Sequence, residues 1–172
     1  MRFTVVKTGL YVLASLAIFL LAGPFLHAQR NDSHVIATSG RSYDLTASDL
    51  SIPLTPQTGD SVKKEFDALR SVARLSLRVS HLQAARQPGV SYAIYLEPLG
   101  TVTRSDAFRV GYINFFSVST GSKGSPFVFE VTDLVHGLLH ASPNLRGLQV
   151  SIVPGGPPES TPSIGSIELI AN

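Results

Sequence analysis

Two histidines, His136 and His140, stand four residues apart and could hold a metal ion. This spacing places both imidazoles on one face of a helix, where they can chelate one ion. Asp133, three residues before His136, is the neighbouring residue that could add a third ligand. The same pattern fits an exposed helix that carries two histidines and no metal, and spacing alone is a weak motif. We favour the plain helix and keep the metal site as the alternative.

Aromatic side chains gather in two segments, around 108–116 and 127–129. Both segments are predicted to be strands, so about half of these rings must point into a core. Phe115 and Phe116 are adjacent and would face opposite sides of a regular strand, which predicts that one of the two is exposed.

The residue types and motifs of the chain do not indicate any other common catalytic or cofactor chemistry. The chain of 172 residues has no cysteine, which excludes disulfides, thiol catalysis and cysteine-ligated metal centres. It contains no G-x-S-x-G nucleophile motif, phosphate-binding P-loop or G-x-G-x-x-G dinucleotide motif. Its carboxylates are scattered, so no pair suggests glycoside hydrolysis.

The N-terminal residues have the order that is typical of an export signal. Arg2 and Lys7 precede an apolar run over 10–22, Gly23-Pro24 breaks the run, and Ala28 offers a small residue for cleavage. The apolar run is shorter than the roughly 20 residues of a membrane-spanning helix. We therefore predict a signal peptide over 1–28 and an exported protein, periplasmic or secreted. An uncleaved anchor is the alternative and would be the only membrane attachment.

Charge argues against a nucleic-acid partner. The chain carries 14 basic and 12 acidic residues, and loss of residues 1–28 removes two basic residues and no acidic one. The remaining chain has a formal charge of zero, whereas nucleic-acid binders need a basic face that releases counterions.

The rest of the chain shows mainly short alternating segments. We expect a flexible lead-in over 29–40, an extended stretch over 43–54, and a short amphipathic helix over 60–71. Strands are expected near 73–80, 90–96, 108–118, 127–131, 148–154 and 164–170. A second helix should run from 132 to 139, capped by Thr132 or Asp133.

These elements define the predicted fold class and domain limits. Short strands with one polar face, not separated by long helices, favour an all-β antiparallel sandwich of about six to eight strands, immunoglobulin-like or jelly-roll-like, with one or two short helices. The sandwich domain should span 60–172, after a flexible or extended lead-in over 29–59.

The second half of the chain resembles the C-terminal domain of polyphenol oxidases, the tyrosinases and catechol oxidases. The segment 127–134, ending Glu130-Val131-Thr132-Asp133-Leu134, is similar to that domain's step from a strand into a Thr-Asp-Leu-Leu helix start. Tyr92–Leu96 stands where the family has its Lys-Phe-Asp-Val strand. Further resembling segments, in the family's order, are 74–79, 108–116, 150–154 and 164–169.

This resemblance implies a β-rich domain that packs against a dicopper domain and shields its active site. Family members insert an aromatic or aliphatic side chain into the substrate pocket as a placeholder, which suggests Tyr95, Tyr112 or Phe116 for that role here. A type-3 dicopper site needs six histidines, and the chain after residue 28 has four. We therefore expect a non-enzyme without a cofactor, with copper only in a partner.

Three functions follow as hypotheses. The first is an exported accessory domain that docks on, shields or stabilises a separately encoded dicopper oxidase. The second is a general binding module for glycans or proteins, using the loops 97–106 and 155–163. The third is a small metal-binding protein that uses His136 and His140.

Overall fold

A computed structural model describes residues 33–57, 62–102, 104–118 and 124–172. The chain divides into two units, 1–31 and 32–172, and all described residues belong to the second. The predicted signal peptide therefore lies outside the described residues. No helix within the described part is long and apolar enough to cross a membrane.

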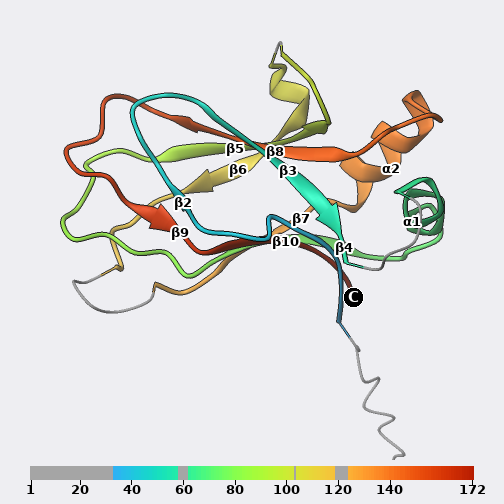
Figure 1. The fold of residues 1–172 in the computed structure, drawn as a ribbon, viewed down its shortest axis with the longest axis horizontal. Helices are drawn as coiled ribbons and strands as arrows, with labels where there is room; N and C mark the ends of the chain where they lie inside the picture. Colours follow the sequence, from blue (N-terminus) through green and yellow to red (C-terminus); the bar gives the residue numbers. More distant parts are fainter. Residues whose placement is uncertain (1–32, 58–61, 103, 119–123) are drawn as a thin grey trace, which may run out of the picture. The chain divides into compact units, whose positions relative to one another are not determined.

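The second unit is built from antiparallel strands and two short helices (Figure 1). One sheet has eight strands in the order β6-β5-β8-β3-β1-β10-β4-β7, and a small second sheet pairs β2 with β9. The strands are β1 His34–Thr38, β2 Tyr43–Asp44, β3 Leu50–Pro56, β4 Leu75–Ser80, β5 Tyr92–Pro98, β6 Arg109–Ile113, β7 Phe127–Glu130, β8 Leu148–Pro154, β9 Ser163–Ile164 and β10 Ser166–Ala171; the helices are α1 Val62–Leu69, α2 Thr132–Ala141 and the 3-10 turn η1 Asp106–Phe108.

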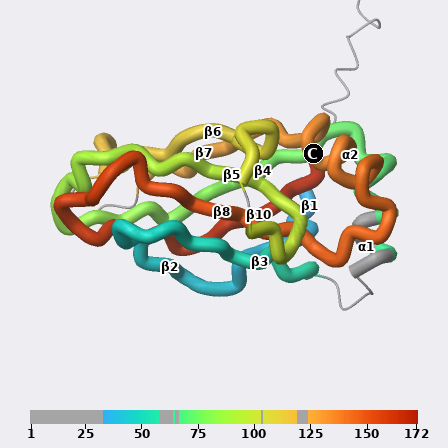
Figure 2. The backbone as a smooth tube through the Cα atoms, turned by 90° about the horizontal axis from the view of Figure 1, so that it is seen from above, coloured from blue at the N-terminus to red at the C-terminus, as the bar shows by residue number. Residues whose placement is uncertain are grey.

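The eight-stranded sheet curls until its two edge strands, β6 and β7, lie next to each other (Figure 2). Among the described residues no backbone pairing joins these edges. Gly111 of β6 faces the Phe129 ring of β7 so closely that a Cβ on Gly111 would lie 2.6 Å from the ring. The two halves of this one sheet thus face each other as the layers of a sandwich do.

Alternating residues from both halves fill the space between them. Side chains such as Ile52, Leu77, Ile94, Val150 and Ile167 are at most 1% exposed. Leu69 of α1 and Val135 and Leu139 of α2 join the same core. Both helices lie at one end of the sheet, and the β2–β9 pair lies toward the other (Figure 1). The predicted all-β antiparallel fold with two helices is confirmed.

The sequence prediction was wrong for the start of the domain. His34–Thr38, placed in a flexible lead-in, forms β1 between β3 and β10, and β3 pairs with β8. Strands β1 and β3 therefore belong to the same sheet as the later strands, whereas β2 between them pairs with β9. A five-residue strand has too little alternation to be recognised locally, and its pairing partner β10 lies more than 120 residues later.

Two predicted strands are shorter than expected. The segment 108–118 contains β6 only over Arg109–Ile113, because the chain turns at Phe116 and Ser117. The last strand is divided into β9 and β10 at Gly165, where a Cβ would lie 2.6 Å from the Cβ of His81.

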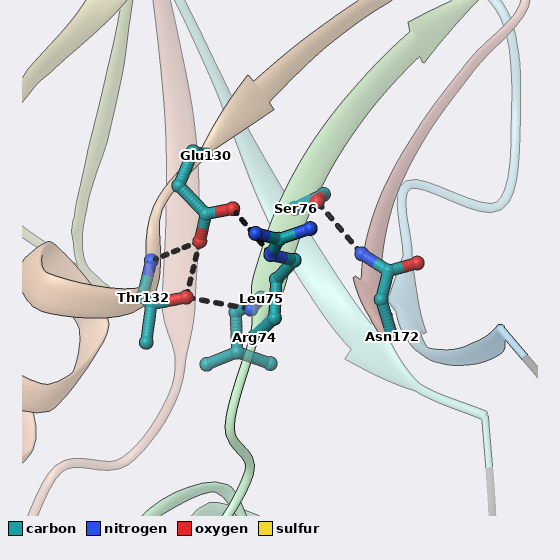
Figure 3. Close-up of polar contacts among 6 residues, drawn as sticks. All are labelled: Arg74, Leu75, Ser76, Glu130, Thr132 and Asn172. Atoms are coloured by element: carbon teal, nitrogen blue, oxygen red, sulfur yellow. Dashed lines mark hydrogen bonds and ion pairs between the residues drawn. The ribbon is translucent and has the colours of Figure 1, made fainter. Parts of the chain in front are cut away.

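The start of α2 is held by a bond that the capping prediction did not foresee (Figure 3). Val131 occupies the N-cap position without a side-chain cap. The Thr132 hydroxyl instead accepts a hydrogen bond of 2.7 Å from the backbone N–H of Leu75 in β4. It also donates to the Glu130 carboxylate, which lies 3.4 Å from the Arg74 guanidinium. Thr132 therefore ties the β7–α2 step to the neighbouring strand.

Candidate functional site

The candidate site is the turn over residues 114–118, directly after β6. Phe115 is fully buried and meets the Tyr92 ring edge to face, with the ring centres 5.8 Å apart. Val118 is also buried, and its backbone N–H donates to the Phe115 carbonyl at 3.0 Å. The turn is thus anchored in the core at both of its ends.

Gln87 holds the same turn from the neighbouring loop. Its side-chain amide donates to the carbonyls of Phe116 and Val118, at 3.4 and 3.2 Å. The Asn114 side chain accepts from the Phe116 N–H at 3.3 Å. These bonds fix the backbone on both sides of one exposed side chain.

Phe116 itself projects from this turn with 68% of its surface exposed. Beside it lies an open depression of about 350 Å³, lined by Ala84, Ala85, Arg86, Gln87, Phe116, Ser117 and Val118. An exposed ring whose backbone is held by hydrogen bonds loses less conformational freedom when a partner covers it, which favours its use as a binding anchor.

Tyr112, the second predicted residue, is 54% exposed on the outer side of β6. The Arg109 guanidinium lies 5.6 Å from the centre of its ring. Arg109 also pairs with Asp106 of η1 at 2.9 Å. Asp106 first, and Tyr112 second, raise the pKa of Arg109, which therefore stays charged beside the ring. Tyr112 thus offers a second exposed aromatic surface, flanked by a fixed cation.

Tyr95, the third predicted residue, is only 9% exposed. It stands opposite Ser151 of β8 and Arg109 of β6, on the outer side of the sheet. In this conformation its ring does not project from the surface. Of the three predicted residues, Phe116 and Tyr112 are therefore the two whose rings are exposed.

The histidine pair is on α2, at the opposite end of the sheet from the turn that carries Phe116 (Figure 1). The ring Nε2 of His136 lies 3.1 Å from the Leu69 carbonyl oxygen, so this imidazole joins α2 to α1. His140 is exposed in the last turn of the helix. Within the described ranges no three His, Cys, Asp or Glu residues come together as a metal site.

Sequence reasoning missed the residues that support the turn. The sequence gives no sign of a role for Gln87, although its side chain donates to the carbonyls of Phe116 and Val118. The Gln87–Phe116 hydrogen bond joins residues 29 positions apart, so no local sequence pattern predicts it. The adjacent Phe115-Phe116 pair was the available signal, since two neighbouring rings cannot both enter one core.

The chain was compared with known proteins. No family model and no curated protein matches it. Similar solved structures include recombinantly expressed latent aurone synthase, a polyphenol oxidase (13% identity, TM-score 0.46, 75% of this chain and 26% of that one). Another is latent apple tyrosinase (15% identity, TM-score 0.42, 78% and 27%). The match spans about a quarter of those proteins, and these values do not assign the chain to their family.

Proposed function

We propose that this chain is a non-catalytic accessory domain that docks on a separately encoded dicopper oxidase of the tyrosinase or catechol oxidase class. It shields or stabilises that enzyme and carries no cofactor of its own. Residues 1–28 direct its export to the periplasm or the outside of the cell. The sequence resemblance over 74–169 motivates this proposal.

The observation that carries the proposal is Phe116. A ring 68% exposed is costly to leave in water, yet the chain holds its backbone with bonds from Gln87 and Asn114 and with the buried ring of Phe115. Such a side chain fits a partner pocket that accepts an aromatic group, and a phenol-oxidising site is built to accept an aromatic ring. Tyr112 would lie at the margin of the same interface.

The test is co-expression with any tyrosinase-type oxidase that the same genome encodes without a C-terminal domain of its own. The complex should copurify, and the chain should lower the oxidation rate of a catechol substrate. The intact mass of the exported chain should correspond to a start at Gln29. Normal yields of both proteins without a complex would overturn the docking proposal, and an exported chain that retains Met1 would overturn the cleavage.

A further inference from the structure

A second depression lies on the outer side of β4 and β10, and its Gly124 adjoins Val118 of the Phe116 turn. Its volume is about 400 Å³, and it is lined by Arg78, Ser80, His81, Gly124, Pro126 and Glu168. Nothing in the proposed docking function uses these residues. Four of the six are polar or charged, namely Arg78, Ser80, His81 and Glu168.

The backbone of His81 is strained at this depression. Its φ of 58° is the one positive value among the described residues other than glycine. A side chain is disfavoured in this left-handed region, and such strain is often kept where a ligand binds. The neighbouring position is Gly165, where any Cβ would lie 2.6 Å from the His81 Cβ. Two positions are thus specialised to hold one imidazole.

The imidazole has a defined partner on the same surface. Its Nδ1 lies 3.4 Å from the hydroxyl oxygen of Ser166, the first residue of β10. Ser166 in turn pairs with Ser80 across the two strands. One wall of the depression is therefore formed by the His81 ring, which Ser166 contacts, and by Ser80.

The other wall is the ion pair between Arg78 and Glu168, which has no net charge. Arg78 reaches one oxygen of Glu168 through Nε at 2.8 Å and through a terminal nitrogen at 2.6 Å. Both side chains are partly open to solvent, with 38% and 22% exposed. A guanidinium can donate further hydrogen bonds and a carboxylate can accept further ones. The site therefore offers both donors and acceptors with little net charge.

We propose that this depression binds a neutral ligand with several hydroxyl groups, namely one or two saccharide units. Adjacent hydroxyls donate to Glu168 and accept from Arg78, and the His81 ring covers one edge of the sugar. The volume lies within the usual range for small-ligand sites. Because the depression is open, the affinity is weak, with a dissociation constant on the order of millimolar.

The test is titration of the isotope-labelled, purified chain with neutral disaccharides (maltose, cellobiose and N,N′-diacetylchitobiose), followed by amide NMR shifts. At least one should shift the amides of His81, Gly124 and Ser166 in a saturable way. His81→Gly relieves the backbone strain, so the chain should keep or raise its melting temperature while affinity falls at least tenfold. His34→Ala, which changes an exposed histidine in β1, should bind normally.

Three outcomes would overturn the saccharide site. The first is the absence of saturable shifts with all three sugars at tens of millimolar. The second is tighter binding of glucose 6-phosphate than of the neutral sugars, which would mean an anion site. The third is unchanged affinity in a folded His81→Gly chain. None of these outcomes bears on docking through Phe116.

Discussion

Thr132 joins α2 to strand β4, a structural role that the sequence around it does not predict. Its hydroxyl accepts from the N–H of Leu75, a residue that is completely buried in β4. The sequence suggested Thr132 as a helix cap, because threonine before an apolar helix is typical of that role. The same hydroxyl instead joins two strands and a helix, which explains the residue in structural terms.

Replacement of Thr132 tests this connection. Thr132→Val keeps the shape but removes the hydroxyl that accepts from the Leu75 N–H and donates to Glu130, and should lower the free energy of unfolding by about 1–3 kcal/mol. Thr132→Ser keeps the hydroxyl and should lose less. Urea unfolding of the three proteins measures the difference. A smaller loss for Val than for Ser would assign the role to the methyl group, which valine keeps and serine lacks, and would contradict the account.

Glu130 gives this region a dependence on pH. The Thr132 hydroxyl, the Thr132 N–H and Arg74 lower the pKa of Glu130, with the hydroxyl bond the largest cause. A folded-state pKa below the unfolded one stabilises the fold above the unfolded pKa, about 4.3 for glutamate. That stability is lost as pH falls through the folded-state pKa.

Glu130→Gln tests this pH dependence when its stability is compared with that of the unchanged chain. At neutral pH the variant should be slightly less stable, and the difference should disappear as the pH falls below about 4. The effect is small because Glu130 is exposed to solvent. Thermal unfolding at a series of pH values measures it, and a difference that does not change with pH would refute the assignment.

Among the elements, those with a strong local pattern could be predicted from sequence. Strand β8 has the predicted bounds, Leu148–Pro154, since proline and glycine residues mark its end. Helix α2 is found where the sequence predicts it, although it already begins at Thr132, one of the two residues expected to cap it, and runs two residues past Leu139. Strand β1 and the end of β6 depend on contacts with distant residues, so their sequences alone did not reveal them.

The contact between edge strands β6 and β7 also escaped prediction, and it rests on Gly111. Gly111→Ala would place a methyl group 2.6 Å from the Phe129 ring. We expect a loss of about 1–3 kcal/mol in unfolding free energy. Phe129→Leu in the same chain should recover part of that loss, because a smaller side chain makes room.

Gly137→Ala is the matched control for this experiment. Nothing lies within 4 Å of a Cβ built at Gly137, which sits inside α2. Alanine should therefore stabilise the helix by about 0.5–1 kcal/mol. If Gly111→Ala were as harmless as Gly137→Ala, the edges of the sheet would not be packed as described.

At the scale of the whole molecule, the positions of the candidate residues depend on how the sheet closes. The sequence suggested Tyr95, Tyr112 and Phe116 equally. The fold buries Tyr95 and leaves the other two exposed. It also separates α2, with His136 and His140, from the Phe116 turn (Figure 1). Alternation along a strand indicates which residues share a face, but a curled sheet decides what covers that face.

The docking proposal assigns most of the binding to the turn over residues 114–118, which carries Phe116. If Phe116 is the anchor, most of the binding energy should reside in that ring and its immediate support. Val102 provides the comparison, since it is 94% exposed and lies on a different loop. Loss of an exposed apolar side chain there should leave binding unchanged.

The most direct measurement is a calorimetric titration of this chain into a dicopper oxidase that the same genome encodes without a C-terminal domain of its own. The unchanged chain and Val102→Ala should bind with equal affinity, and Phe116→Ala should bind at least about tenfold more weakly while remaining folded. Equal affinities for all three proteins, or no binding by the unchanged chain, would contradict the proposal that Phe116 anchors this domain on an oxidase.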